Sequence, residues 1–300
     1  MPVPRREVIP TVINGIDISD HNTWTMPDFK KVKAAGNDFV IVRIGWAGYA
    51  GEIHEDARAR KAVEAALAAG LNVGLYVYTY ATSVAAAKKA AKEAVEFAKD
   101  FYITYPIVYD IEEVNKAKYP QFVNLSKAAK TATVAAFCDE VERLGYYAMY
   151  YTYTSCALTY LDTSKLSKYD FWVADYRNPQ KCMYNGKYGM WQWIGDNGRV
   201  NGVVGACDRN YAYKDYAAII KRAKLNNTDK IQKPAVKVEE VAFKVGDRVK
   251  IIGTRYATGQ TVPAWVKKSS YSIRSVDNTR KRVLLAGILS WVAFDDVVKE

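Results

Sequence analysis

Residues 105–113, YPIVYDIEE, form an apolar stretch that ends in three acids, and the rest of the chain is organised around them. The β-branched and aromatic residues predict a buried strand, in which Pro106 is tolerated because it lies near the start. Since side chains alternate across a strand, Asp110 and Glu112 point to one side, roughly 6.6 Å apart at the usual rise. The other side is shared by Ile107, Tyr109, Ile111 and Glu113. Two neighbouring carboxylates at the end of a buried strand indicate chemistry; the alternative is a pair of solvated acids that only end the strand.

The composition predicts a globular chain with an anionic partner. Its 300 residues are enough for one large and one small domain, and half of them are hydrophobic. The 23 tyrosines and 7 tryptophans supply rings for the core and for stacking on sugars or bases. A net charge of +11 favours nucleic acid, anionic lipid or an anionic cell wall as the partner.

Targeting and redox signals are weak. No stretch has the apolar length of a transmembrane helix, so no membrane insertion is expected. The N-terminal MPVPRREVIP lacks the apolar core of a signal peptide, which predicts synthesis in the cytoplasm, with export by another route left open. The cysteines form no CxxC pair and have no histidine pair nearby, so we expect free buried thiols rather than zinc ligands or disulfides. They are Cys138, Cys156, Cys182 and Cys207.

Strand-like and helix-like segments alternate through the first 225 residues. Strands are expected at 13–20, 37–45, 71–81, 105–113, 146–154, 171–176, 188–195 and 202–213, and helices at 27–36, 54–70, 83–101, 126–145 and 214–225. Five strand–helix units followed by short strands predict an irregular, TIM-like α/β barrel. The alternative is an open doubly wound sheet, which usually carries a glycine-rich phosphate loop that this sequence lacks.

The C-terminal part has a different character. Residues 226–240 are polar and charged, which predicts a linker. Residues 241–300 alternate in the way of short strands and predict a small all-β barrel. This segment holds 11 Lys and Arg against 5 Asp and Glu, over half of the excess charge of the chain, so an anionic partner is expected to dock there.

Four acids lie where predicted strands end, namely Asp17, Asp110, Glu112 and Asp208. In an α/β barrel these ends converge on one face, and the first and last strands are neighbours, so the four can meet. Carboxylates can supply the acid and the stabilising anion for glycosidic cleavage, while rings stack on sugars. The aromatic residues near these ends are Tyr78, Tyr109, Tyr151, Tyr176 and Trp191.

A metal site is the competing use of clustered acids, and magnesium or calcium would accept such ligands. A phosphodiesterase-like centre would recruit histidines, and the sequence has only His21 and His54. We expect His21 to be structural and His54 to be exposed, and we predict neither metal nor cofactor.

Four segments, in this order, resemble the glycoside hydrolase family 25 lysozymes. They are GIDISDHN at 15–22, Asp110-Ile111-Glu112, WVADY at 172–176, and WQW…CDRNYAY at 191–213. The resemblance covers roughly residues 12–222. It implies an irregular β/α barrel that cleaves the β-1,4 bond between N-acetylmuramic acid and N-acetylglucosamine in peptidoglycan.

The family's acidic positions fall on Asp17, on the D-x-E pair Asp110 and Glu112, and on Asp208 of the D-x-N-Y motif. The family's Y-x-F segment reads Tyr76-Val77-Tyr78 here, which is a mild departure. The tail resembles the SH3-like modules that end many phage lysins, through residues 256–273 and 287–292.

From the resemblance and the chemistry together we expect Glu112 to be the general acid. Asp110 would stabilise the developing positive charge or orient the N-acetyl group of the substrate, with net retention of configuration. Asp17 and Asp208 would support the pair. The expected substrate-binding rings are Tyr78, Tyr151, Tyr176 and Trp191.

The expected partners are peptidoglycan and its anionic wall polymers, with the tail as the wall anchor; the oligomeric state is left open. A leaderless wall hydrolase is typical of a phage or prophage endolysin. Two alternatives are a cell-wall carbohydrate-binding protein without catalysis and a nucleic-acid-binding protein, the latter suggested only by charge.

Overall fold

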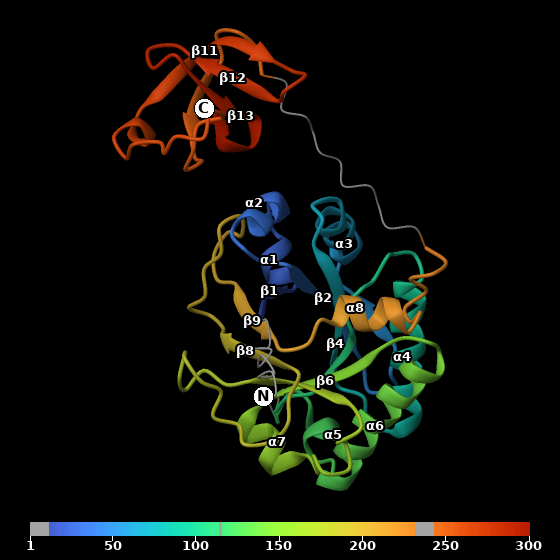
Figure 1. Ribbon diagram of the computed structural model, residues 1–300. Coiled ribbons are helices and arrows are strands. Elements are labelled where there is room, and N and C mark those ends of the chain that lie inside the picture. The colour runs from blue at the N-terminus through green and yellow to red at the C-terminus, as the bar shows by residue number, and fades with distance from the viewer. Residues whose placement is uncertain (1–11, 114–115, 232–242) are drawn as a thin grey trace, which may run out of the picture. The chain divides into compact units, whose positions relative to one another are not determined.

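The computed structural model describes residues 12–113, 116–231 and 243–300. These fall into two compact units, 12–231 and 243–300, shown in Figure 1. Residues 232–240 of the predicted linker lie outside the described residues. Asn226, at its predicted start, is buried in the larger unit, where it donates to Tyr105 O and accepts from Tyr147 N.

The larger unit is a closed barrel. Its strands, in order round the barrel, are β1 (Ile13–Ile18), β9 (Asp208–Ala212), β8 (Met190–Ile194), β7 (Asp170–Ala174), β6 (Ala148–Tyr153), β5 (Ile107–Asp110), β4 (Asn72–Thr79) and β2 (Phe39–Ala47). A pairing between β1 and β2 closes the ring. All neighbours are parallel except β9, which is antiparallel to both β1 and β8. The predicted α/β barrel is confirmed, including the contact between its first and last strands.

Helices follow the first five barrel strands and the last one. They are α1 (Asp20–Thr23), α2 (Phe29–Ala34), α3 (Ala59–Ala68), α4 (Val84–Ala98), α5 (Pro120–Val123), α6 (Lys127–Arg143), α7 (Thr154–Tyr160) and α8 (Tyr216–Arg222). The two long helices begin at serine caps: Ser83 accepts from Ala86 N and Ser126 from Ala129 N, each at 3.1 Å. The short helices α1, α5 and α7 were not expected from the sequence.

The expected helix over 54–70 starts later than predicted. Residues Ile53–Glu55 instead form a short strand, β3, antiparallel to the end of β2. Gly45 permits this approach, because a Cβ there would lie 2.0 Å from His54 O. Pairing with an existing strand edge outweighs the helical tendency of these residues.

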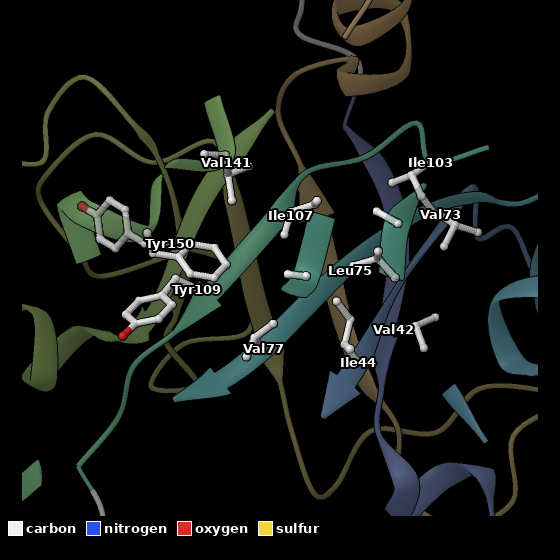
Figure 2. Close-up of a cluster of buried hydrophobic side chains, with 14 of the residues drawn as sticks. Val42, Ile44, Val73, Leu75, Val77, Ile103, Ile107, Tyr109, Val141 and Tyr150 are labelled. Atoms are coloured by element: carbon white, nitrogen blue, oxygen red, sulfur yellow. The ribbon is translucent and has the colours of Figure 1, made fainter. Parts of the chain in front are cut away.

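Two apolar layers hold the barrel. Outward-facing side chains form one buried cluster with residues of the helices. Figure 2 shows Val77, Ile107 and Tyr109 of the strands in this cluster, together with Val141 of α6. Inward-facing side chains fill the end where the strands begin, with Ile41, Val108, Met149, Trp172 and Met190 as members. Helix α8 closes that end, since its Tyr216 ring contacts Tyr105 and Tyr147. The other end, where the parallel strands finish, is left for polar groups.

The smaller unit is a five-stranded antiparallel sheet with its own core. Its strands are β10 (Arg248–Ile251), β11 (Ser270–Asp277), β12 (Arg282–Leu285), β13 (Ser290–Ala293) and β14 (Val297–Lys299), in the order β13-β12-β11-β10-β14, with single 3-10 turns η1 (Val266–Lys268) and η2 (Phe294–Asp296). Val249, Ile273, Val283 and Val292 are fully or almost fully buried. Trp265 is 65% exposed.

All four cysteines are buried and free. Within the described residues, no helix has the length and apolar character required to cross a bilayer.

Candidate active site

Strand ends bring the four predicted acids together. Asp17 lies near the end of β1, Asp110 ends β5, and Glu112 follows two residues later. Because β9 runs antiparallel to β1, its first residue, Asp208, pairs directly with Asp17. Closure of the barrel therefore makes Asp17 and Asp208 neighbours in space although they lie far apart in the sequence.

The four acids line one small pocket of about 70 Å³. A groove of about 1090 Å³ shares part of its lining with this pocket, namely Glu112, Tyr151, Gln192 and Asp208. Asp17 and Asp110 line only the small pocket. Glu112 and Asp208 are thus the acids that a ligand in the groove meets first.

Asp17 is held by two amide side chains. Gln192 Nε2 and Asn210 Nδ2 both donate to Asp17 Oδ2, each at 2.8 Å, and all three residues are buried. Burial raises the pKa of Asp17 to about 6, and the hydrogen bonds from Asn210 and Gln192 oppose the rise. The two donors therefore keep Oδ2 as an acceptor.

Each amide is oriented by a further bond on its oxygen. Tyr151 Oη donates to Gln192 Oε1 at 2.8 Å, and Tyr176 Oη contacts the same oxygen. On the other amide, Trp172 Nε1 donates to Asn210 Oδ1 at 2.8 Å. An amide whose oxygen accepts a fixed donor must point its nitrogen the other way, so these rings set the direction of both donors toward Asp17.

Asp110 and Glu112 form the most crowded pair. Burial, followed by repulsion from Glu112 and Asp17, holds the pKa of Asp110 well above its usual range. Burial also raises the pKa of Glu112 to about 7, with repulsion from Asp17 adding to it and a hydrogen bond with Asp110 opposing it. The pair therefore retains a proton near neutral pH. Asp110 Oδ1 is buried and makes no hydrogen bond within the described residues.

Asp208 completes the cluster and is also more difficult to ionise than an exposed aspartate. Burial and then repulsion from Asp17 raise the pKa of Asp208 to about 8. Four carboxyls in one enclosed pocket cannot all ionise together, because each charge raises the cost of the next.

Arg43 supplies a positive charge on the β2 side of the site. Its Nε donates to Asp56 Oδ2 at 2.8 Å, and its Nη2 binds Asp20. The charge of Arg43 partly offsets the rise in the pKa of Asp110. Asp56 and Asp20 thus fix a cation beside the acids without belonging to the pocket lining.

The predicted rings divide into two groups. Tyr151 and Tyr176 line the groove, and Tyr176 is 52% exposed. Tyr78 pairs in register with Asp110, and its pKa is raised by burial and by the charges of Glu112 and Asp110, so its hydroxyl lies near both acids.

Trp191 requires a correction. The structure places its ring in the outer core, 2% exposed, with Nε1 donating to Asp175 O at 2.9 Å. On β8 the neighbours Met190 and Gln192 face the barrel interior, so alternation turns Trp191 outward. It is absent from the groove lining, whereas Trp193 is present.

Several site residues escaped the sequence reasoning. Gln192 and Asn210 lie inside the quoted WQW and CDRNYAY segments but received no role, and Tyr76 and Trp172 line the small pocket. Strand parity could have found Gln192 and Tyr76, which lie two residues from other inward positions. Nothing in the sequence pairs Arg43 with Asp56, because that contact depends on the position of the β3 turn.

The histidines lie outside this cluster. The His21 side chain is 84% exposed, and the His54 ring stacks on Trp46 with 3.9 Å between centroids. In the part of the chain that the structure describes, no group of three or more His, Cys, Asp or Glu is arranged to hold a metal ion.

Comparisons with known proteins agree with this geometry. The family model "Glycosyl hydrolases family 25" matches residues 16–203. No curated protein matches the chain in sequence.

Among solved structures, the modular autolysin LytC from Streptococcus pneumoniae, in complex with a synthetic peptidoglycan ligand, is similar with a TM-score of 0.59 and 27% identity. The similarity covers 67% of this chain and 46% of the autolysin, so the chain spans less than half the length of that relative.

Two further structures are similar in fold. The bacterial lysozyme from Streptomyces coelicolor has a TM-score of 0.55 and 22% identity over 72% of this chain and 98% of its own. The catalytic domain of endolysin ply40 from bacteriophage P40 of Listeria monocytogenes has a TM-score of 0.55 and 21% identity over 70% and 97%.

Proposed function

The chain belongs to the glycosyl hydrolases of family 25, and from that premise we propose that it is a muramidase. It cleaves the β-1,4 bond between N-acetylmuramic acid and N-acetylglucosamine in peptidoglycan. The observation that carries this proposal is the pocket in which Asp17, Asp110, Glu112 and Asp208 meet beside a long groove. The peptidoglycan ligand of the similar autolysin supports the substrate class.

Glu112 is the proposed general acid. It lines both the groove and the small pocket, so its carboxyl can reach a glycosidic oxygen bound in the groove. With its pKa raised to about 7, Glu112 carries a proton over part of its population at neutral pH. Asp110 is 4% exposed and lies behind it, which does not suit direct protonation of a leaving group.

Asp110 is the proposed residue that stabilises the positive charge developing on the substrate sugar in the transition state. Its Oδ1, buried without a hydrogen bond among the described residues, can accept from the N-acetyl N–H of the substrate. That bond would orient the acetamido oxygen toward the anomeric carbon and lead to net retention. Asp17 and Asp208 tune this pair, and Tyr78, Tyr151 and Tyr176 contact the sugars.

The smaller unit is the proposed wall anchor, an SH3-like module whose basic surface suits anionic wall polymers. Residues 241–300 carry 11 Lys and Arg against 5 Asp and Glu, which supports attraction to such polymers. Release onto the wall as an endolysin is proposed as well, since an endolysin catalytic domain shares the fold.

Cell-wall zymography tests the proposal. The full chain should clear a peptidoglycan gel and release new N-acetylmuramic acid reducing ends, while Glu112→Gln should fold with a Tm no lower than that of wild type and clear nothing. NMR of the first-formed anomer reports retention. Near-normal clearing by Glu112→Gln would refute the assignment of the acid. A wild-type chain that binds walls without clearing them would favour a carbohydrate-binding protein without catalysis.

A further inference from the structure

The groove extends beyond the acids. Its volume of about 1090 Å³ slightly exceeds the range of roughly 300–1,000 Å³ that is usual for pockets that bind drug-sized ligands. Part of its lining comes from α7 and from the segment after β7, including Leu158, Arg177 and Pro179. The groove therefore continues from the acids to α7 and the segment after β7.

Arg177 is held in place on this wall. Its Nε donates to Asp175 Oδ1 at 2.8 Å and its Nη2 to Asp175 Oδ2 at 2.5 Å. The Asp175 carboxylate is 1% exposed and also accepts from Thr154 Oγ1 and Met183 N. Such a bidentate pair fixes the guanidinium plane before any ligand arrives, which lowers the entropic cost of binding.

The guanidinium retains donors for a ligand, and Arg177 lines the groove. The Arg177 side chain is 59% exposed, and its Nη1 makes no hydrogen bond within the described residues. Among the described residues that line the groove, Arg177 is the only Lys or Arg. The acids in the lining are Glu112, Asp175, Asp196 and Asp208. A fixed planar donor of this kind matches a carboxylate.

The same part of the groove lining also includes apolar side chains. Leu158 is 64% exposed and Pro179 is exposed, and both line the groove. A sugar ring offers hydroxyl groups, whereas a groove lined by both an exposed leucine and a guanidinium suits a branch that has both methyl groups and a carboxylate.

We propose that Arg177 is a specificity-determining residue that binds a carboxylate on the lactyl–peptide branch of N-acetylmuramic acid. This rests on the proposed function, because that branch occurs only on peptidoglycan-type glycans. The carboxylate has two sources: the lactyl group itself when no peptide is attached, and the peptide when it is. Arg177 acts in substrate choice and takes no part in the bond cleavage.

Three soluble glycan substrates test this with the full-length chain. One keeps its stem peptides, one has them removed to free the lactyl carboxylate, and one has that carboxylate converted to a neutral amide. Wild type, Arg177→Gln and Arg222→Gln are compared by kcat/KM on each. Arg222 is exposed on α8, at the closed end of the barrel, and serves as a matched loss of charge.

The readout is the ratio of kcat/KM on each charged substrate to kcat/KM on the amide. This ratio is independent of the folded fraction, so partial instability of Arg177→Gln does not affect it. We expect Arg177→Gln to lower the ratio roughly tenfold, the usual size for a hydrogen bond to a charged group, and Arg222→Gln to leave it at the wild-type value. A fall confined to the peptide-bearing substrate identifies the peptide carboxylate, and a fall on the stripped glycan identifies the lactyl carboxylate.

An unchanged ratio in Arg177→Gln, or an equal loss on all three substrates, would overturn the proposal while leaving the muramidase assignment intact. A wild-type chain that cleaves none of the three would instead overturn the proposed function, and this proposal with it.

Discussion

At the scale of single residues, the site is governed by the two amides that bind one oxygen of Asp17. Gln192 and Asn210 donate to Oδ2, and tyrosine and tryptophan donors fix each amide from behind. Buried networks of this kind are strong when every member is satisfied and costly when one is lost. We therefore expect substitutions at the amides to change the chemistry of the acids rather than only the stability of the fold.

Gln192→Glu tests this network. A carboxylate at that position still accepts from Tyr151 but cannot donate to Asp17, and it adds a negative charge to the cluster. We expect kcat/KM to fall at least tenfold, which corresponds to a free-energy change on the order of 1.4 kcal/mol. The alkaline limb of the pH profile of kcat/KM, which the Glu112 pKa of about 7 sets, should move to higher pH. The pH profile of kcat/KM measures both. Gln192→Met, which lacks the charge, should lose activity without the upward shift; identical profiles for the two variants would contradict the electrostatic reason.

Asp208→Asn tests how much the ionisation of Asp208 lowers the stability of the fold. Since the folded-state pKa of Asp208, about 8, exceeds its ordinary value of 3.8, the fold gains from its protonation below pH 4 and loses that gain as pH rises through 8. Asparagine cannot ionise, so the variant should exceed wild type in unfolding free energy by several kcal/mol at pH 8. The difference should shrink toward pH 4. Denaturant unfolding at the two pH values measures it, and a constant difference would argue against the shifted pKa.

At the scale of elements, short strands place the site because their ends are fixed by neighbours. β5 spans only Ile107–Asp110, yet it pairs with β4 and β6, which puts Asp110 beside Tyr78 and Tyr151. β9 runs against its neighbours and so delivers its first residue, Asp208, to the end where the parallel strands finish. A parallel last strand would have placed Asp208 at the closed end of the barrel.

Gly74 in β4 shows how tightly the barrel interior is closed. A Cβ at this position would lie 2.7 Å from Ile41 Cδ1, 2.8 Å from Tyr105 Cβ and 2.9 Å from Pro106 O. Because backbone as well as side chain must move, Gly74→Ala should lower the unfolding free energy by about 2 kcal/mol. Calorimetry should show a lower Tm for the larger unit alone. An unchanged Tm would mean that the start of β5 can shift without cost.

At the scale of the whole molecule, the described chain has two units with separate cores. The larger core lies between barrel and helices and within the barrel, while the smaller is formed by residues such as Val249, Ile273 and Val283. Each unit buries its own apolar surface, so we expect each to fold by itself.

Removal of residues 238–300 separates catalysis from anchoring. The truncated chain should keep its kcat/KM on soluble glycan fragments, because every residue of the pocket and groove lies before residue 209. On intact walls it should lose activity roughly tenfold or more, since tethering raises the local concentration of substrate. Turbidity loss of wall suspensions measures the activity on intact walls, and reducing-end release measures the activity on soluble fragments. An equal loss on both substrates would contradict an anchoring role.

The sequence by itself determined the barrel and the four acids, because strand alternation, helix caps and strand-end carboxylates are local signals that tertiary packing did not override. YPIVYDIEE alone placed Asp110 and Glu112 at the end of a strand, but the observed strand stops at Asp110, so alternation does not set the direction of Glu112. Gln192 could have been found by the same parity that turns Trp191 into the core. Only the tertiary structure decided that Asp17 and Asp208 are paired, that Asn210 and Gln192 hold one oxygen, and that Arg177 faces the groove. These contacts join residues up to 193 positions apart, and barrel closure, which brings them together, also supplies the burial that raises the pKa of the acids.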